Sequence, residues 1–274
     1  MAIRRADTEL SPFNLALVRW FLASAGFLVV FPFFGKPKSK FDKRDLPRIL
    51  IIALLNVPAY HLALNSAEVT VSAGVSGLLI SLGPIFIAVL SVYFLKEKLS
   101  KMLIIAIVLG VVGTIVLSIP DFMSNSSMTI LGSLEVIIAA GSFATFSVLS
   151  KPLVQKYGSA PVTIWAGLAG TLMLLPLLSP SFTFQIARLS LGGWVSVVYL
   201  SILSTVIGYL LFYSLVSQGA LSKLSIQLYL IPIVSVIGGV LILQEGLNIY
   251  IILGGLILLA SVALATVKKK TTEK

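Results

Sequence analysis

Four polar side chains that could contact a substrate lie in the second long apolar stretch, Leu46–Ser66: Asn56, Tyr60, His61 and Asn65. Polar groups are costly inside a membrane span and usually face an interior or a water-filled cavity. On a helix, Asn56, Tyr60 and His61 share roughly one face. The pattern predicts the wall of a substrate cavity. The alternative is a kinked helix that packs against its neighbours.

His61 is the single histidine of the chain and the candidate proton carrier, because imidazole changes its charge near physiological pH. The alternative is a neutral histidine that only forms hydrogen bonds, since charge is costly inside a membrane. Pro58, three residues earlier, removes a backbone hydrogen bond and is expected to loosen the helix beside it.

Two charged residues, Glu135 and Arg19, lie well inside predicted spans. Each of them has two interpretations. Glu135 is either buried, and then protonated or paired, or it lies at an external helix end. Arg19 follows Pro12 by seven residues, which corresponds to roughly 10 Å along a helix. Arg19 either attracts substrate anions or holds helices together, and we favour the structural role.

Aromatic and amide side chains in the later spans complete the candidate cavity. Tyr209 and Tyr213 are one helical turn apart and lie deeper than the usual interfacial anchors. Gln227 and Tyr229 follow in the next span. The residues predicted to line one central cavity between two halves of the protein are Tyr60, His61, Tyr209, Tyr213 and Gln227.

The elements that position these residues follow from composition. The chain has 274 residues, of which 58% are hydrophobic and 11% are charged, whereas soluble domains have about 25% charged residues. Nine apolar blocks have the length of about 17–25 residues that crosses a bilayer as a helix. We therefore predict an all-α polytopic membrane protein and exclude a soluble enzyme, a nucleic-acid binder and a disulfide scaffold. The predicted spans are Pro12–Phe34, Leu46–Ser66, Val71–Leu95, Met102–Ile119, Met128–Leu149, Val162–Leu178, Leu191–Val216, Leu224–Leu243 and Ile249–Val267.

The sequence lacks the residues that several kinds of catalytic and metal-binding site require. The sequence has no cysteine and one histidine, which argues against thiol nucleophiles and against Cys- or His-built metal sites. It also has no G-x-x-x-x-G-K-[ST] motif, so direct ATP drive is not expected. We expect no cofactor, no metal and no enzymatic activity. An intramembrane lipid-modifying enzyme and a non-transporting scaffold or channel remain the alternatives.

Basic residues predict the orientation in the membrane. Sixteen of them fall on one side of the predicted spans, whereas Arg4, Arg5 and Arg188 fall on the other. Because cytoplasmic loops are enriched in Lys and Arg, the Lys-rich side is assigned to the cytoplasm of a cell membrane. The tail, residues 268–274, is then cytoplasmic, and the net charge of +10 reflects these loops and not nucleic acid.

The chain repeats itself at an offset of 148 residues. Pro84 precedes Glu97 by 13 residues, and Pro232 precedes Glu245 by the same number. Glu97 falls on the Lys-rich side and Glu245 on the other, so the two copies are predicted to be inverted, as in many transporters. Together with Arg19, these four residues are candidates for structural or gating roles.

The two predicted repeats are unequal in length. Residues 1–120 form the first repeat and residues 128–268 the second, which has one more span. Aligning Pro12 with Pro161, at an offset of 149, places the counterpart of Met128–Leu149 before Met1. We therefore expect a native reading frame that extends upstream by about 20–30 residues and restores ten helices.

Three stretches of the chain resemble the EamA-type transporters of the drug/metabolite transporter superfamily. They are residues 2–23, which include Arg19, residues 63–100 and residues 209–247. The resemblance implies ten helices in two inverted halves, with both termini cytoplasmic. It also implies export of amino acids or other small metabolites. We thus expect a secondary transporter that works by alternating access, with the lipid bilayer and a small-molecule substrate as partners. Its driving force is either a substrate gradient or a coupled ion, for which a proton is the candidate.

Overall fold

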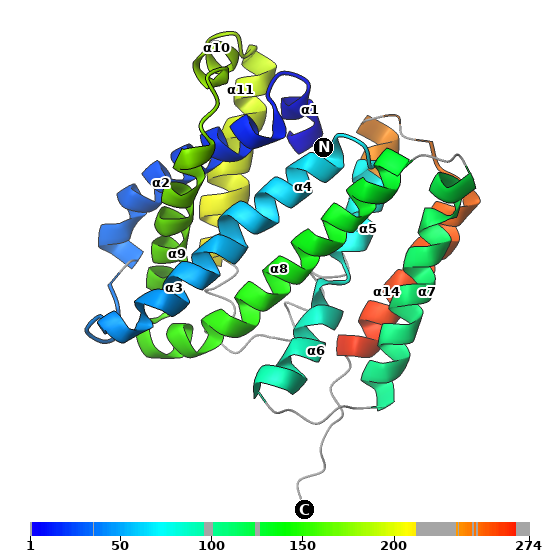
Figure 1. The fold of residues 1–274 in the computed structure, drawn as a ribbon, viewed down its shortest axis with the longest axis horizontal. Coiled ribbons are helices and arrows are strands. Elements are labelled where there is room, and N and C mark those ends of the chain that lie inside the picture. The colour runs from blue at the N-terminus through cyan, green and yellow to red at the C-terminus, as the bar shows by residue number, and fades with distance from the viewer. Residues whose placement is uncertain are drawn as a thin grey trace, which may run out of the picture.

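The computed structural model of the chain describes residues 2–34, 36–95, 101–123, 127–211, 234, 236–242, 244 and 246–266. All the regular elements of these residues are helices, as Figure 1 shows. The predicted all-α class is confirmed for this part of the chain. The elements of the first predicted repeat are α1 (Ala2–Asp7), α2 (Pro12–Phe34), η1 (Lys43–Asp45), α3 (Leu46–Leu54), η2 (Leu55–Ala59), α4 (Tyr60–Glu68), α5 (Ala73–Ile80), α6 (Gly83–Leu95) and α7 (Lys101–Met123).

The second predicted repeat begins with the longest described helix. Its elements are α8 (Ser127–Tyr157), α9 (Ser159–Leu174), η3 (Leu175–Leu177), α10 (Phe182–Ala187), α11 (Leu191–Val198), η4 (Tyr199–Ile207) and α14 (Ile249–Thr266).

Six described helical stretches are long and apolar enough to cross a membrane. Two shorter apolar stretches, Ile104–Leu117 and Ile249–Leu264, fall in two further predicted spans. The predicted span Leu224–Leu243 lies mostly outside the described residues, so the count of nine stays a prediction. The six long stretches are Pro12–Phe34, Lys43–Glu68, Ala73–Phe94, Thr129–Tyr157, Ser159–Leu177 and Leu191–Leu211.

The structure differs from the predicted spans in two places. The span predicted as continuous from Val71 to Leu95 is interrupted between α5 and α6. Pro84, the second residue of α6, cannot donate a backbone hydrogen bond and disfavours helix at the residue before it. In the second place, α8 continues to Tyr157, eight residues past the predicted end of its span at Leu149.

The helices of the two predicted repeats pack against one another along their lengths. Helix α8 lies against α3, η2, α4, α5 and α6, while α9 packs on α2 and α3 and α14 packs on α7 (Figure 1). Gly170 permits the close approach of α9 to η2. A Cβ atom there would collide with Val57 and come within 2.9 Å of the carbonyl oxygen of Ala53. The core therefore lies where residues of the two repeats meet.

Candidate functional site

Arg19 is buried on α2, with 5% of its surface exposed. Its Nε and Nη2 atoms donate hydrogen bonds to Oγ1 of Thr205, at 3.2 and 3.1 Å. The Thr205 hydroxyl in turn donates to the carbonyl oxygen of Leu200, at 2.7 Å. Within the described part of the chain, Arg19 forms no ion pair. Helix α2 of the first repeat is thus joined to η4 of the second by a buried cation.

Two π-helical segments flank this cation. In η2, Pro58 cannot donate a backbone hydrogen bond, and in η4 the Thr205 hydroxyl is bonded to the carbonyl five residues earlier. Residues 203–207 of η4 lie 148 positions after residues 55–59, which form η2. Such widened turns are frequent at functional sites. The two segments occupy equivalent positions in the two predicted repeats.

Trp20, next to Arg19, brings two predicted site residues together. Its ring centroid lies 5.1 Å from that of His61 and 6.5 Å from that of Tyr209. Tyr209 donates a hydrogen bond of 2.9 Å to Oδ1 of Asn56. His61 and Tyr209 are themselves 148 residues apart in the sequence. Residues from α2, η2, α4 and the helix after η4 therefore meet at one place.

Tyr60 extends this group toward α8. Its ring contacts that of His61, with centroids 4.7 Å apart, and that of Phe143 on α8, with centroids 5.8 Å apart. Tyr60, Tyr209 and the buried carboxyl group of Glu68 all lie close enough to Arg19 to act on it electrostatically. We call the following set the Arg19 cluster: Arg19, Trp20, Asn56, Tyr60, His61, Thr205 and Tyr209.

Several polar atoms of the cluster have no hydrogen-bond partner among the described residues. Both ring nitrogens of His61 and the Nδ2 atom of Asn56 are buried without one, and each of the two residues is 1% exposed. Buried polar groups in native proteins are nearly always paired. The cluster therefore has the hydrogen-bonding capacity that a polar ligand would use.

The other predicted site residues are placed elsewhere. Asn65 is fully buried and donates to the carbonyl oxygen of Pro12 at 3.2 Å, which ties α4 to the start of α2. Glu135 is half-buried on α8, and no hydrogen bond or ion pair joins it to the Arg19 cluster. Pro84 lies at the break between α5 and α6. Six predicted residues lie outside the described part of the chain: Glu97, Tyr213, Gln227, Tyr229, Pro232 and Glu245.

Thr205 and Trp20 are the cluster residues that sequence reasoning missed. A threonine is a weak signal in an apolar span, because its hydroxyl can bond the helix backbone. The repeat offset was the usable signal, because Thr205 lies 148 residues after Val57 in η2. Trp20 could be found from its position beside Arg19.

Arg19 and His61 are almost fully buried within the cluster, at 5% and 1% exposed. A hollow of about 490 Å³ lies away from the cluster, on the apolar outer face of α11 and η4. The stretch Leu191–Leu211 that carries this face is 28% buried, compared with 44–50% for the other five long stretches. A ligand could reach the Arg19 cluster only after the surrounding helices move apart.

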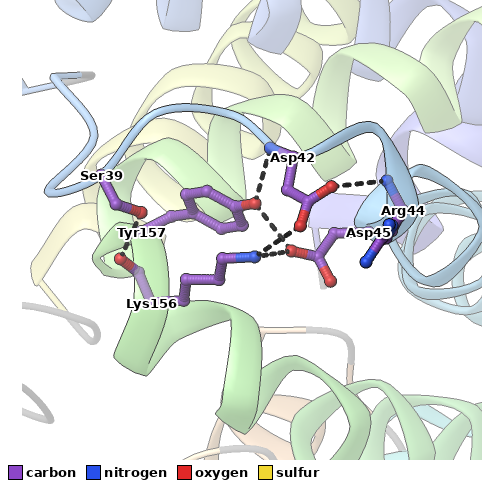
Figure 2. A network of polar contacts seen from close by, with 6 residues as sticks. All are labelled: Ser39, Asp42, Arg44, Asp45, Lys156 and Tyr157. Carbon is purple, nitrogen blue, oxygen red and sulfur yellow. Dashed lines mark hydrogen bonds and ion pairs between the residues drawn. The ribbon is translucent and has the colours of Figure 1, made fainter.

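At the Lys-rich end of the molecule, the loop before η1 is bound to the last turn of α8 (Figure 2). Nζ of Lys156 lies 2.7 Å from Oδ2 of Asp45 and 3.3 Å from Oδ2 of Asp42. Tyr157 donates to Asp45 Oδ2 at 2.7 Å and accepts from the backbone N–H of Asp42 at 3.0 Å. Ser39 adds a hydrogen bond of 3.0 Å to the carbonyl oxygen of Lys156. We call these residues the Tyr157 network.

At the opposite end, the segment between α1 and α2 is bound to the α10–α11 region. The Glu9 carboxylate accepts from the backbone N–H and the hydroxyl of Ser190, both at 2.6 Å. Oε1 of Gln185 accepts from the backbone N–H of Ser11 at 3.0 Å and from Nδ2 of Asn14 at 2.8 Å. We call these residues the Glu9 contact.

The two ends occupy related positions in the sequence. Tyr157 lies 149 residues after Thr8, the neighbour of Glu9, and Ser190 lies 148 residues after Asp42. Each contact thus joins a loop of one predicted repeat to the end of a helical segment of the other.

Comparisons with known proteins identify the family and the fold. The model of the EamA-like transporter family matches residues 1–119 and 130–267. A solved crystal structure with 18% sequence identity shares the fold at a TM-score of 0.62, covering 97% of this chain and 93% of the other.

Relatives in three organisms carry transporter names. An "uncharacterized transporter" of Archaeoglobus fulgidus is 33% identical, over 94% of this chain and 90% of the relative. The "uncharacterized transporter YdfC" of Bacillus subtilis is 30% identical, over 99% and 87%. A "probable terminal-alkyne amino-acid exporter" of Streptantibioticus cattleyicolor is 29% identical, over 81% and 73%. With its helical fold and its two family matches, the chain belongs to the EamA-like transporter family.

Proposed function

We propose that this protein is a secondary transporter that exports small metabolites such as amino acids. The observation that carries the proposal is the Arg19 cluster, a buried polar group in an apolar helical protein. Polar and ionisable groups inside a membrane protein usually mark a substrate or ion pathway. The cluster takes residues from both predicted repeats, where transporters of this kind hold their substrates.

The proposed mechanism is alternating access between two inverted repeats, residues 1–120 and 128–268. The equivalent positions of η2 and η4 and the two family matches support the repeats. The Tyr157 network and the Glu9 contact each connect the two repeats, one at either end. Opening one while the other stays closed would expose the Arg19 cluster to one side of the membrane at a time.

Two observations support an amino-acid-like substrate. The name of the Streptantibioticus cattleyicolor relative specifies amino-acid export. The cluster itself combines a cation with the rings of Trp20, Tyr60 and Tyr209. Such surroundings suit a small molecule that has one charged end and one apolar or aromatic end.

A coupled proton is the proposed driving force, with His61 as its carrier. His61 lies inside the cluster, and no described residue forms a hydrogen bond with either of its ring nitrogens. In this proposal His61 binds a proton when water or substrate enters. Exchange of an entering proton for a departing metabolite would then drive export.

Reconstituted vesicles test the function directly. Radiolabelled leucine and phenylalanine should exchange across proteoliposomes preloaded with the same amino acid, and an acidic interior should drive their accumulation. Absence of exchange for a broad amino-acid and organic-acid panel would refute the proposal and favour a scaffold or an enzyme.

A variant of His61 tests the coupling of transport to protons. His61→Gln should abolish accumulation driven by the pH gradient while leaving exchange intact. Glu135→Gln is the matched control, because Glu135 also lies within a predicted span but outside the cluster. Normal gradient-driven accumulation in His61→Gln would show that another group carries the proton.

A further inference from the structure

Arg19 is a buried cation that forms no ion pair within the described part of the chain. A guanidinium has five N–H donors, but the described acceptor of Arg19 is a single hydroxyl oxygen, that of Thr205. A buried charge without a counter-charge is costly unless something compensates it. Tyr60 and Tyr209 are neutral phenols, and the buried acid Glu68, which acts electrostatically on Arg19, forms no ion pair with it among the described contacts.

The fold does not require a cation at this depth. The alignment of Pro12 with Pro161 places Leu168 of α9 at the position equivalent to Arg19. The second predicted repeat therefore has an apolar side chain, that of Leu168, at the position that Arg19 occupies in the first. Packing between α2 and η4, the elements that Arg19 joins, is also supplied by a buried apolar cluster that includes Phe27 and Val206. A purely structural role leaves the charge of Arg19 unexplained.

We propose that Arg19 binds the carboxylate of the transported molecule and makes the site selective for small monocarboxylates with an apolar or aromatic side chain. A guanidinium matches a carboxylate through two parallel hydrogen bonds. Nδ2 of Asn56, which has no acceptor, supplies a further donor nearby. Arg19 is the one Lys or Arg of the cluster, so it balances a monoanion better than a phosphate dianion. The inference rests on the proposed transport function, whose site it specifies.

The rings of the cluster define the rest of the ligand. Trp20, His61, Tyr60 and Phe143 follow one another with centroids between 4.7 and 5.8 Å apart. They form a continuous aromatic row that begins beside Arg19 and reaches α8. A ligand whose carboxylate contacts Arg19 would place an apolar side chain along these rings.

The test compares an acid with its uncharged amide of nearly the same shape. The probes are 3-phenylpropanoate and 4-methylpentanoate, with 3-phenylpropanamide and 4-methylpentanamide as their matched neutral forms. The chain has three tryptophans, so replacing Trp165 and Trp194 by Phe leaves Trp20 as the reporter inside the cluster. Binding is measured as the saturable change of Trp20 emission in purified protein in nanodiscs, where no gradient exists.

We expect both acids to bind at least tenfold more tightly than their amides. Arg19→Gln should weaken acid binding at least tenfold and leave amide binding within about twofold, since it removes the charge. Arg19→Lys keeps the positive charge but loses the planar guanidinium, so its affinity for the acids should lie between that of the parent and that of Arg19→Gln. The matched control, Ser24→Ala, removes a buried hydrogen bond of the same helix, that between Ser24 and Thr171, and should bind acids like the parent.

Three outcomes would overturn the inference: equal affinity for acids and amides, unchanged acid binding in both Arg19 variants, or no ligand-induced emission change at all. Size-exclusion profiles establish that each variant is folded before titration. Failure of the transport proposal can be distinguished from failure of the proposed role of Arg19. Exchange in proteoliposomes without acid selectivity refutes only the role of Arg19, whereas Arg19-dependent acid binding without exchange refutes only transport.

Discussion

The Tyr157 network and the Glu9 contact occupy related positions at opposite ends of the molecule, but they are built differently. At the Lys-rich end, one ammonium and two carboxylates surround the hydroxyl of a fully buried tyrosine. At the opposite end, the described contacts join one carboxylate and one amide oxygen to neutral donors. If these are the two closures of an alternating-access cycle, they should differ in strength and in their response to salt.

Burial and not charge should decide the strength of the Tyr157 network. Side chains of Lys156 and Asp42 are 41% and 43% exposed, and exposed ion pairs contribute little because water and salt screen them. The ring of Tyr157 instead packs against Trp165 and Phe41, with centroids 5.3 and 6.1 Å apart. Its two hydrogen bonds are therefore held in place by a packed aromatic group.

The largest expected effect concerns which end faces the cytoplasm. The chain has no cysteine, so single cysteines at Lys40 and Thr183, both exposed, report on the two ends without a background. An impermeant thiol reagent applied to intact cells should label the residue 183 variant and should label the residue 40 variant only after the membrane is opened. The reverse pattern would contradict the orientation predicted from the basic residues.

Tyr157→Phe should have the next largest effect, because it removes the hydroxyl, leaves the N–H of Asp42 without its described partner and leaves Asp45 with Lys156 alone. Losing such buried hydrogen bonds costs about 1–3 kcal/mol. Spin labels at Lys40 and Gln155, both exposed, should show a new population at longer distance. Labels at Phe13 and Thr183 serve as the control and should not show it. An unchanged distribution at the Lys-rich end would mean that the network is not a closure.

Ser190→Ala should open the opposite end to a smaller extent. It removes one donor to Glu9 and also the side-chain cap of α11, since Ser190 Oγ accepts from the backbone N–H of Gly193 at 3.0 Å. Loss of such a cap costs typically about 1 kcal/mol, and the backbone N–H of Ser190 remains as a donor. The labels at Phe13 and Thr183 should now separate while those at Lys40 and Gln155 do not. Separation of both pairs together would show that the two ends are not independent.

The helical fold could be predicted largely from hydropathy. Span Pro12–Phe34 coincides with α2, because a long unbroken apolar run in lipid has no alternative to a helix. The break at Ser81 and Leu82 was missed, although Pro84 was noticed as part of the repeat. A proline specifies where a hydrogen bond is lost, but tertiary packing decides whether the helix bends or stops there.

The candidate site was predictable only in part. Asn56, His61 and Tyr209 were selected as polar residues in apolar spans, and the structure brings them together. Asn65 met the same criterion but ties α4 to the start of α2. The helical period predicts which side chains lie on the same face of a helix. The residues that those side chains contact belong to helices distant in the sequence, and the helical period does not predict them. The structural role was favoured for Arg19 because its described acceptor, Thr205, lies on a helix distant in the sequence and becomes visible only in three dimensions.

The smallest expected effect is that of Lys156→Gln, which removes both ion pairs of the Tyr157 network but keeps its tyrosine. Glutamine still reaches Asp45 with a neutral donor, and the removed charge is exposed. The distance between labels at Lys40 and Gln155 should therefore change little at low salt. Raising KCl from 50 mM to 1 M should slightly lengthen that distance in the parent, because the Debye length falls from more than 10 Å to about 3 Å, and this response should vanish in the variant. A Lys156→Gln protein as open as Tyr157→Phe would show that charge, and not the buried tyrosine, holds this end closed.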